Sequence, residues 1–208
     1  SLLPEKNTHI SGKILYLEKD GSYTDILTMP FKKRTEYCAR KVSLIFQDSI
    51  NALNPFERIQ KQWHETVAIH HPQMKKEEMD THIKERLKLF GIADDEALRK
   101  YPHQLSGGMK RKLMVCRALL TSPEILLLDE PTRGIDVGAK AEIYKLINEL
   151  TAQGMAIVLI SSELPEVMGM SDRLLIMYEG RVTGQLLKEE YTEERVMEYA
   201  TGRKVHNE

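Results

Sequence analysis

The sequence predicts an α/β protein with a mainly parallel sheet, an inserted α-helical subdomain and an antiparallel β portion near its start. Short apolar runs at 125–129, 155–160 and 174–177 are typical of buried strands, and helical patterns lie between them. Strands that alternate with helices form parallel sheets. A helical stretch from about 49 to 118 separates these runs from an earlier strand candidate at 42–46.

The elements of the first half are short. Residues 12–29 mix apolar side chains with the turn pair Asp20-Gly21 and predict short strands or a hairpin. Residues 79–90 place an apolar side chain on one helix face at each turn, and Gly91 then ends the helix. The same spacing recurs after Ser106, a favourable N-cap residue. These patterns predict at least two amphipathic helices.

The second half predicts three buried strands joined by helices. A helix follows the strand at 125–129, with apolar residues on one side between 143 and 150, and another helix begins at Pro165. Residues 178–181, Tyr-Glu-Gly-Arg, predict a hairpin turn after the strand at 174–177. We expect all three apolar strands to belong to the parallel sheet, with 42–46 and 155–160 flanking 125–129.

Composition excludes several classes of function. Among 208 residues, Lys+Arg is 30 and Asp+Glu is 31, so no basic excess favours nucleic acid or an anionic membrane surface. The longest apolar run, Met155–Ile160, is too short to cross a bilayer. Two cysteines, Cys38 and Cys116, exclude a disulfide framework and a cysteine-rich zinc site. These features predict a soluble cytoplasmic protein.

Two adjacent acids, Asp129 and Glu130, follow the apolar run at 125–128. Open α/β sheets bind ligands at the carboxyl ends of their strands. One carboxylate there can hold hydrated Mg²⁺, and the next can orient or deprotonate an attacking water. A strand that ends in an ordinary polar turn explains the pair equally well.

The segment Leu-Ser-Gly-Gly-Met at 105–109 favours phosphate binding. Two glycines at a helix start let backbone N–H groups approach a phosphate, and the helix dipole favours the anion. A helix cap alone would require Ser106 but not the destabilising glycines Gly107 and Gly108.

These motifs together resemble the ATPase subunits of ATP-binding cassette (ABC) transporters. The segments at 105–109, 125–132 and 133–136 are similar, in order and spacing, to the family's signature motif, Walker B and D-loop, and Phe46-Gln47-Asp48 is similar to its Q-loop. The resemblance covers essentially the whole chain. It implies the P-loop NTPase fold of an ABC cassette, here incomplete.

The resemblance implies a role for each matching residue. Asp129 and Gln47 would contact Mg²⁺, Glu130 would be the catalytic base, and Gln47 would also signal to the membrane partner. Three residues of the signature motif would contact the γ-phosphate of ATP held mainly by a second subunit: Ser106, Gly107 and Gly108. Asp136 would lie in the dimer interface near the partner's nucleotide.

The resemblance also implies an organisation and partners. Residues 1–48 would be a partial, β-rich N-terminal part, 49–118 the helical signature subdomain, and 119–208 the RecA-like core with Walker B, D-loop and switch region. Two cassettes, identical or different, would sandwich ATP and dock on transmembrane permease subunits at the cytoplasmic face of the membrane. A solute-binding protein would act indirectly, and no nucleic acid is expected.

The sequence departs from the family in two places. No G-x-x-x-x-G-K-[ST] P-loop, which would cradle the phosphates, occurs in the 208 residues. We therefore expect the natural polypeptide to continue upstream, and this chain alone to hydrolyse little or no ATP. Ser162 stands where the family usually has its switch histidine, and a serine carries no positive charge.

Two lineages are combined in the resemblance. Phe46–Met109 resembles dipeptide, oligopeptide and nickel importers, whereas the sequence from Lys110 onward resembles the second cassette of sugar importers. The transported solute therefore stays open between peptide, nickel and sugar. A degenerate cassette that only docks on partners is the alternative to an ATPase, and soluble cassette proteins of repair or translation fit less well. Trp63 either packs in the helical subdomain or helps to dock the membrane subunit.

Overall fold

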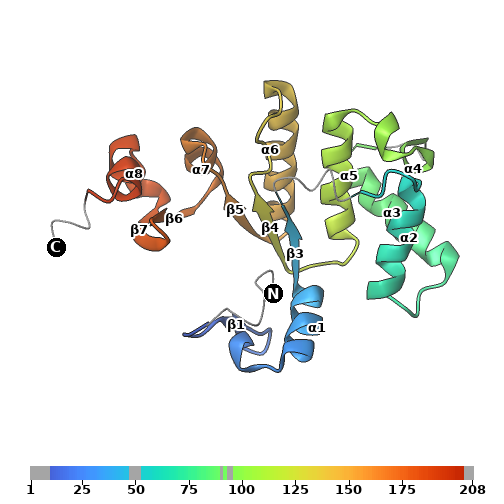
Figure 1. Cartoon of the computed structure of the whole chain (residues 1–208), viewed down its shortest axis with the longest axis horizontal. Helices are drawn as coiled ribbons and strands as arrows, with labels where there is room; N and C mark the ends of the chain where they lie inside the picture. The colour runs from blue at the N-terminus through green and yellow to red at the C-terminus, as the bar shows by residue number, and fades with distance from the viewer. Residues whose placement is uncertain (1–9, 47–52, 90, 93–95, 204–208) are drawn as a thin grey trace.

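The computed structural model describes residues 10–46, 53–89, 91–92 and 96–203. Three groups of elements follow one another along the longest axis of the molecule (Figure 1): the helices α2–α5, a central sheet, and a C-terminal hairpin with its helices. The N-terminal ribbon and α1 lie at one side of the central sheet. The sequence-predicted division into sheet-forming parts around a helical insertion agrees with this arrangement.

The central sheet contains three parallel strands in the order β3 (Val42–Ile45), β4 (Ile125–Asp129) and β5 (Ala156–Ile160). Ile45 pairs with Leu128, and Asp129 pairs with Ile160 at the carboxyl edge. The prediction that the strand of Asp129 lies between the strands at 42 and 155 is confirmed.

One face of this sheet is covered and the other is open. Leu126 and Leu128 are fully buried in the core that α5 (Gly107–Leu119) and α6 (Val137–Ala152) complete. The opposite row joins Leu44, Leu127 and Val158 in register, and Val158 is 48% exposed. The expectation that β5 is a fully buried strand is wrong, because alternate side chains of a strand point to opposite faces and only one face is covered.

The helical subdomain has its own core. It comprises α2 (Ile59–His70), α3 (Lys76–Leu89), α4 (Glu96–Arg99) and α5, with a 3₁₀ turn at Pro102–Gln104. Trp63 is fully buried there, so packing and not docking accounts for this side chain. Cys116 is also buried, and burial raises the pKa of its thiol, which keeps it protonated and inert.

The N-terminal part pairs β1 (Leu15–Leu17) with β2 (Tyr23–Asp25) in an antiparallel hairpin, as predicted. A 3₁₀ turn at Ile26–Thr28 then leads to α1 (Phe31–Lys41). Sequence reasoning missed α1. Its segment is rich in lysine and arginine and has few apolar side chains, and none of its residues is buried in the structure.

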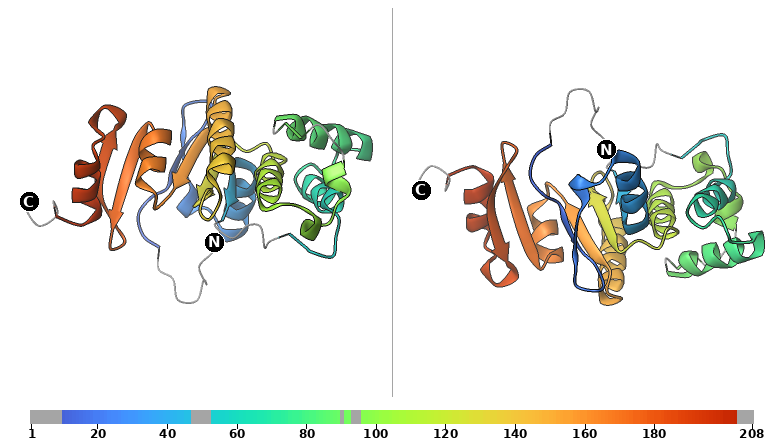
Figure 2. Two further views of the ribbon diagram at one scale, coloured as in Figure 1. Left: turned by 90° about the horizontal axis from the view of Figure 1, so that it is seen from above. Right: turned by 90° about the horizontal axis from the view of Figure 1, so that it is seen from below.

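The C-terminal elements form a separate antiparallel hairpin, seen at one end of the molecule in Figure 2. It pairs β6 (Arg173–Tyr178) with β7 (Arg181–Leu187), and α7 (Leu164–Met170), a 3₁₀ turn at Lys188–Glu190 and α8 (Glu193–Ala200) flank it. Leu174, Ile176 and Leu186 form a second small core.

This hairpin corrects one expectation and confirms another. The strand at 174–177 does not join the parallel sheet, because its hydrogen bonds go to β7 after a tight turn. The predicted turn at 178–181 is present, with positive φ at Glu179 and Gly180 as a hairpin turn requires.

Within the described residues, no helix combines the length and the apolar character that crossing a membrane requires.

Candidate active site at the carboxyl edge of the sheet

The candidate acids lie where β4 ends. Asp129 is the last residue of β4, and Glu130 follows with a φ of 49°. This left-handed conformation is unfavourable for a residue with a side chain. It is held by a hydrogen bond that the backbone N–H of Glu130 donates to the carbonyl of Ile160, at 2.8 Å. Both carboxylates are half-buried at this edge.

Glu130 contacts the segment that follows the neighbouring strand. Its Oε1 accepts a hydrogen bond from the backbone N–H of Ser162, at 2.9 Å. The structure therefore brings together Asp129, Glu130 and Ser162, which the sequence assigned to one site. A carboxylate that accepts a backbone N–H keeps its remaining lone pairs available for water.

A polar layer that sequence reasoning missed lies beneath this edge. Thr132 is fully buried, and its hydroxyl donates to Oε1 of Glu166 in α7 at 2.7 Å. Lys140 of α6 donates to both carboxylate oxygens of Glu163, at 2.6 and 2.5 Å. Glu163 and Glu166, one and four positions after Ser162, carried no signal of burial in the sequence, because their pattern matches an ordinary surface helix.

The predicted cap of α5 is confirmed. The Ser106 hydroxyl accepts from the backbone N–H of Met109 at 3.2 Å, and Gly107 and Gly108 form the first helical turn. A Cβ on Gly107 would meet open space, so its backbone is accessible from outside. A Cβ on Gly108 would lie 4.0 Å from Cβ of Ala139, so the starts of α5 and α6 are neighbours.

Asp136 has a local role that the sequence analysis did not assign. Its Oδ1 accepts from the backbone N–H of Ala139 at 2.9 Å and caps α6. A guanidinium N–H of Arg111 in α5 donates to the carbonyl of Arg133 at 2.8 Å, which ties α5 to the turn before Asp136. Gly134, with a φ of 70°, allows this turn.

The carboxyl edge suits a hard cation. Among the described residues, no group of three or more His, Cys, Asp or Glu side chains is arranged to hold a metal ion by itself. Mg²⁺ is typically held by one or two carboxylates together with phosphates and waters, and the half-buried Asp129 and Glu130 supply such oxygens. The donor set therefore fits Mg²⁺ with a nucleotide. Gln47, the third residue expected here, lies outside the described residues.

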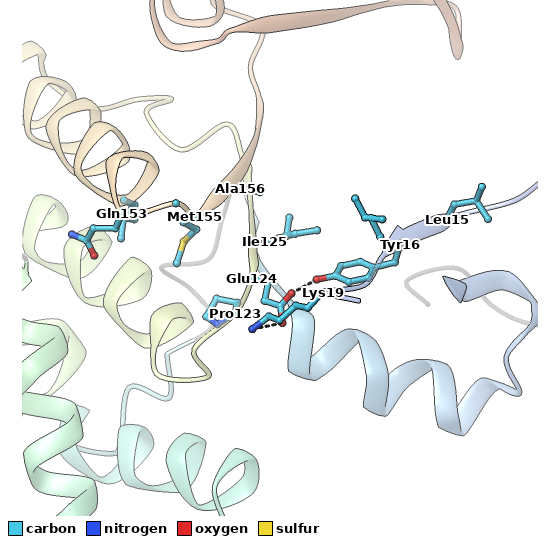
Figure 3. A pocket seen from close by; sticks show the side chains of 12 residues that line it. Leu15, Tyr16, Lys19, Pro123, Glu124, Ile125, Gln153, Met155 and Ala156 are labelled. Atoms are coloured by element: carbon cyan, nitrogen blue, oxygen red, sulfur yellow. Dashed lines mark hydrogen bonds and ion pairs between the residues drawn. The ribbon is translucent and has the colours of Figure 1, made fainter. Parts of the chain in front are cut away.

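A groove of about 650 Å³ opens at the opposite edge of the sheet, where β4 and β5 begin (Figure 3). Glu124 accepts from the Tyr16 hydroxyl and from Lys41 there, and these hydrogen bonds lower the pKa of the Glu124 carboxyl. The groove lies at the amino ends of the strands, away from Asp129. It is therefore distinct from the candidate active site.

Together these features define a class. A parallel sheet that ends in Asp129 and Glu130, together with an inserted helical subdomain that carries a serine-capped glycine pair, is the architecture of an ATP-binding cassette. Residues 1–133 match the ABC transporter family. The chain belongs to this family.

Close sequence relatives are named as sugar-import proteins. The chain is 66% identical over 101 residues to the xylose import ATP-binding protein XylG of Geobacillus kaustophilus, covering 49% of this chain and 20% of the relative. It is 57% identical over 102 residues to the ribose import ATP-binding protein RbsA of Oceanobacillus iheyensis, covering 49% and 21%. The matched segment thus spans about a fifth of the length of these curated relatives.

Solved cassettes share the fold. A dimeric post-hydrolysis structure of the ATP-binding cassette MJ0796 bound to ADP and Pi superimposes with a TM-score of 0.68 at 22% identity, over 81% of this chain and 72% of that chain. The structure of cbiO1 from Clostridium perfringens, part of the ABC transporter complex cbiONQ, gives a TM-score of 0.67 at 26% identity, over 85% and 67%. The expected cassette fold is confirmed.

Proposed function

We propose that the chain is part of the ATP-binding subunit of an ABC importer that takes up a sugar. The observation that carries this proposal is the position of Asp129 and Glu130 at the carboxyl edge of the sheet, where Glu130 accepts a hydrogen bond from Ser162 just after β5. The names of the xylose and ribose import relatives support the sugar over the peptide and nickel alternatives.

In this proposal the edge residues act on ATP and Mg²⁺. Asp129 would hold Mg²⁺, which would neutralise charge on the phosphates, and Glu130 would orient or deprotonate the water that attacks the γ-phosphate. Gln47, which lies outside the described residues, would add a metal contact, and Ser162 would occupy the switch position without a positive charge. A hydrogen-bonded but half-buried Glu130 supports the role of base, because such a carboxylate is oriented and still reaches water.

The signature residues act on a second cassette. Ser106, Gly107 and Gly108 present the start of α5, whose first N–H groups are donors for a γ-phosphate. Asp136 lies at the neighbouring start of α6, in the proposed interface between two cassettes. The exposure of Ser106, Gly107 and Asp136 supports this use, since their surface is accessible to a partner.

The proposed organisation keeps the three parts 1–48, 49–118 and 119–208. The chain would lie at the cytoplasmic face of the membrane through protein contacts with permease subunits, and a solute-binding protein would act on those subunits. The alternative is a docking module that does not hydrolyse ATP. The sequence feature that favours this alternative is the absence of a P-loop string together with Ser162.

A mixture with a complete cassette tests the proposal. A fluorescent ATP analogue with Mg²⁺ is titrated against a complete cassette with its own P-loop and a Glu→Gln base substitution, with and without this chain. We expect the chain to tighten nucleotide binding and to co-elute as a dimer, and Ser106→Arg to abolish both effects. Exposed Asn148→Arg, on α6, is the matched control and is expected to leave both effects unchanged. Unchanged nucleotide binding in the presence of the folded chain would contradict the proposal.

A further inference from the structure

A buried carboxylate outside the proposed machinery lies directly beneath it. Glu166, in α7, is 3% exposed, and its Oε1 accepts from the fully buried Thr132 hydroxyl at 2.7 Å. Within the described part of the chain, Oε2 of Glu166 has no hydrogen-bond partner. Burying a carboxylate with one oxygen unsatisfied costs free energy of folding. The presence of a glutamate at this position therefore requires an explanation.

Glu166 joins two segments that carry the candidate site. Thr132 lies two residues after Glu130, and Glu166 lies four residues after Ser162. Three contacts therefore connect the same two segments: Glu130 N–H to Ile160 carbonyl, Ser162 N–H to Glu130 Oε1, and Thr132 hydroxyl to Glu166 Oε1. The last is the buried one, so water does not compete for it.

Helix α6 supports this junction from the side. Burial raises the pKa of the Tyr144 phenol, and the Glu166 carboxylate raises it further, whereas the Thr132 hydroxyl lowers it. Lys140, one helical turn before Tyr144, binds Glu163. Side chains from α6, from the start of α7 and from the turn after β4 thus surround the buried contact between Thr132 and Glu166.

We propose that Glu166 is a positioning residue, which acts through Thr132 to hold the Glu130 carboxylate against the Ser162 amide. Glu130 has an unfavourable φ of 49°, and such a conformation persists only where surrounding contacts determine it. The buried hydrogen bond fixes the turn two residues further on. Its relevance to catalysis rests on the proposed function, but the contact itself does not.

The Ser162 amide gives a direct measure of this positioning. An N–H that donates to a charged oxygen forms a charge-assisted hydrogen bond, and its proton resonance shifts when the acceptor is lost. The chain is labelled with ¹⁵N-serine, and Glu130→Met gives the Ser162 resonance without the acceptor. Thr132→Val and Glu166→Met each remove one side of the buried bond. Thr132→Ser and Glu166→Gln keep a donor and an acceptor and are the matched controls.

We expect Thr132→Val and Glu166→Met to move the Ser162 resonance to its position in Glu130→Met, while both controls stay at the wild-type position. Thermal melting measures the loss of stability separately, and a purely structural role would lower Tm without moving this resonance. A wild-type Ser162 resonance in a folded Thr132→Val or Glu166→Met chain overturns the inference. Should one of them not fold, the other decides, since they remove opposite sides of one bond.

The measurement contains no nucleotide. Its failure would leave the ATP titration of the proposed function unaffected, and failure of that titration would leave this result standing.

Discussion

Oε1 of Glu130 and the backbone N–H of Ser162 lie 2.9 Å apart and join the ends of two neighbouring strands. In return, the Glu130 N–H donates to Ile160, two residues before Ser162, at 2.8 Å. The candidate base Glu130 is therefore oriented by the end of β5 and by Ser162, the proposed switch position. A substitution that moves the backbone at the end of one strand is therefore expected to shift the end of the other strand as well.

The isolated chain is expected to release no phosphate from MgATP above a buffer blank. Its sequence contains no G-x-x-x-x-G-K-[ST], the loop whose N–H groups and lysine hold the phosphates. A phosphate-release assay checks this, with Glu130→Gln as the matched protein. If the purified chain hydrolyses MgATP and Glu130→Gln abolishes this activity, the expectation is wrong.

Replacing Trp63 tests the core of the helical subdomain. Trp63 is fully buried, and Trp63→Ala is expected to lower the free energy of unfolding by about 3–5 kcal/mol through lost burial and a cavity. Urea unfolding followed by circular dichroism measures the change. Phe56, which is 87% exposed, is the control, and Phe56→Ala is expected to change stability by no more than about 0.5 kcal/mol. Similar effects of both substitutions would contradict the placement of Trp63.

The hairpin between β6 and β7 offers a stabilising substitution. Glu179 has a φ of 47° and precedes Gly180, and asparagine-glycine is the preferred pair for a turn with two positive φ values. Glu179→Asn is expected to raise the free energy of unfolding by up to about 1 kcal/mol. Thermal melting compares it with Glu189→Asn, a substitution of an exposed glutamate at the opposite end of the same hairpin. A gain that is equal in both variants would argue against strain at Glu179.

Glu124 should contribute to the loss of stability in acid. Hydrogen bonds from Lys41 and then Tyr16 lower the pKa of its carboxyl below the ordinary 4.5. A folded-state pKa that is lowered contributes stability above the unfolded value, and this contribution disappears as the pH falls through the folded value. Below pH 4.5, stability should therefore fall less steeply in Glu124→Gln than in the wild type. Exposed Glu85→Gln serves as the control, and a wild-type acid slope in Glu124→Gln would refute the assignment.

Much of the candidate site follows from local sequence. The apolar run before Asp129 predicts a strand end, and strand ends of parallel sheets meet at one edge, so Asp129 and Ser162 could be assigned to the same side. Ser106 before two glycines predicts a capped helix start, which the hydrogen bond to Met109 confirms. The polar side chains of Thr132 and Glu166 could not be assigned in this way. Their burial depends on how α7 packs, and no periodic pattern encodes it.

The strand at 174–177 shows where pattern alone misleads. An apolar run is compatible with a parallel strand and with a hairpin strand. The strand at 174–177 pairs with β7 because a two-residue turn places β7 directly beside it. Helix α1 was missed for a different reason: its segment contains few apolar side chains and buries none of its residues.

The sequence by itself determined the order of the motifs, the strand and helix that carry each of them, and hence the family. Backbone propensity and motif spacing are local properties of the sequence, so they do not depend on tertiary contacts. The tertiary structure alone decided which sheet face is covered, that Trp63 is interior, and that Glu166 reaches Thr132. These outcomes depend on contacts between segments up to 34 residues apart in the site, and such contacts arise only when the helices pack.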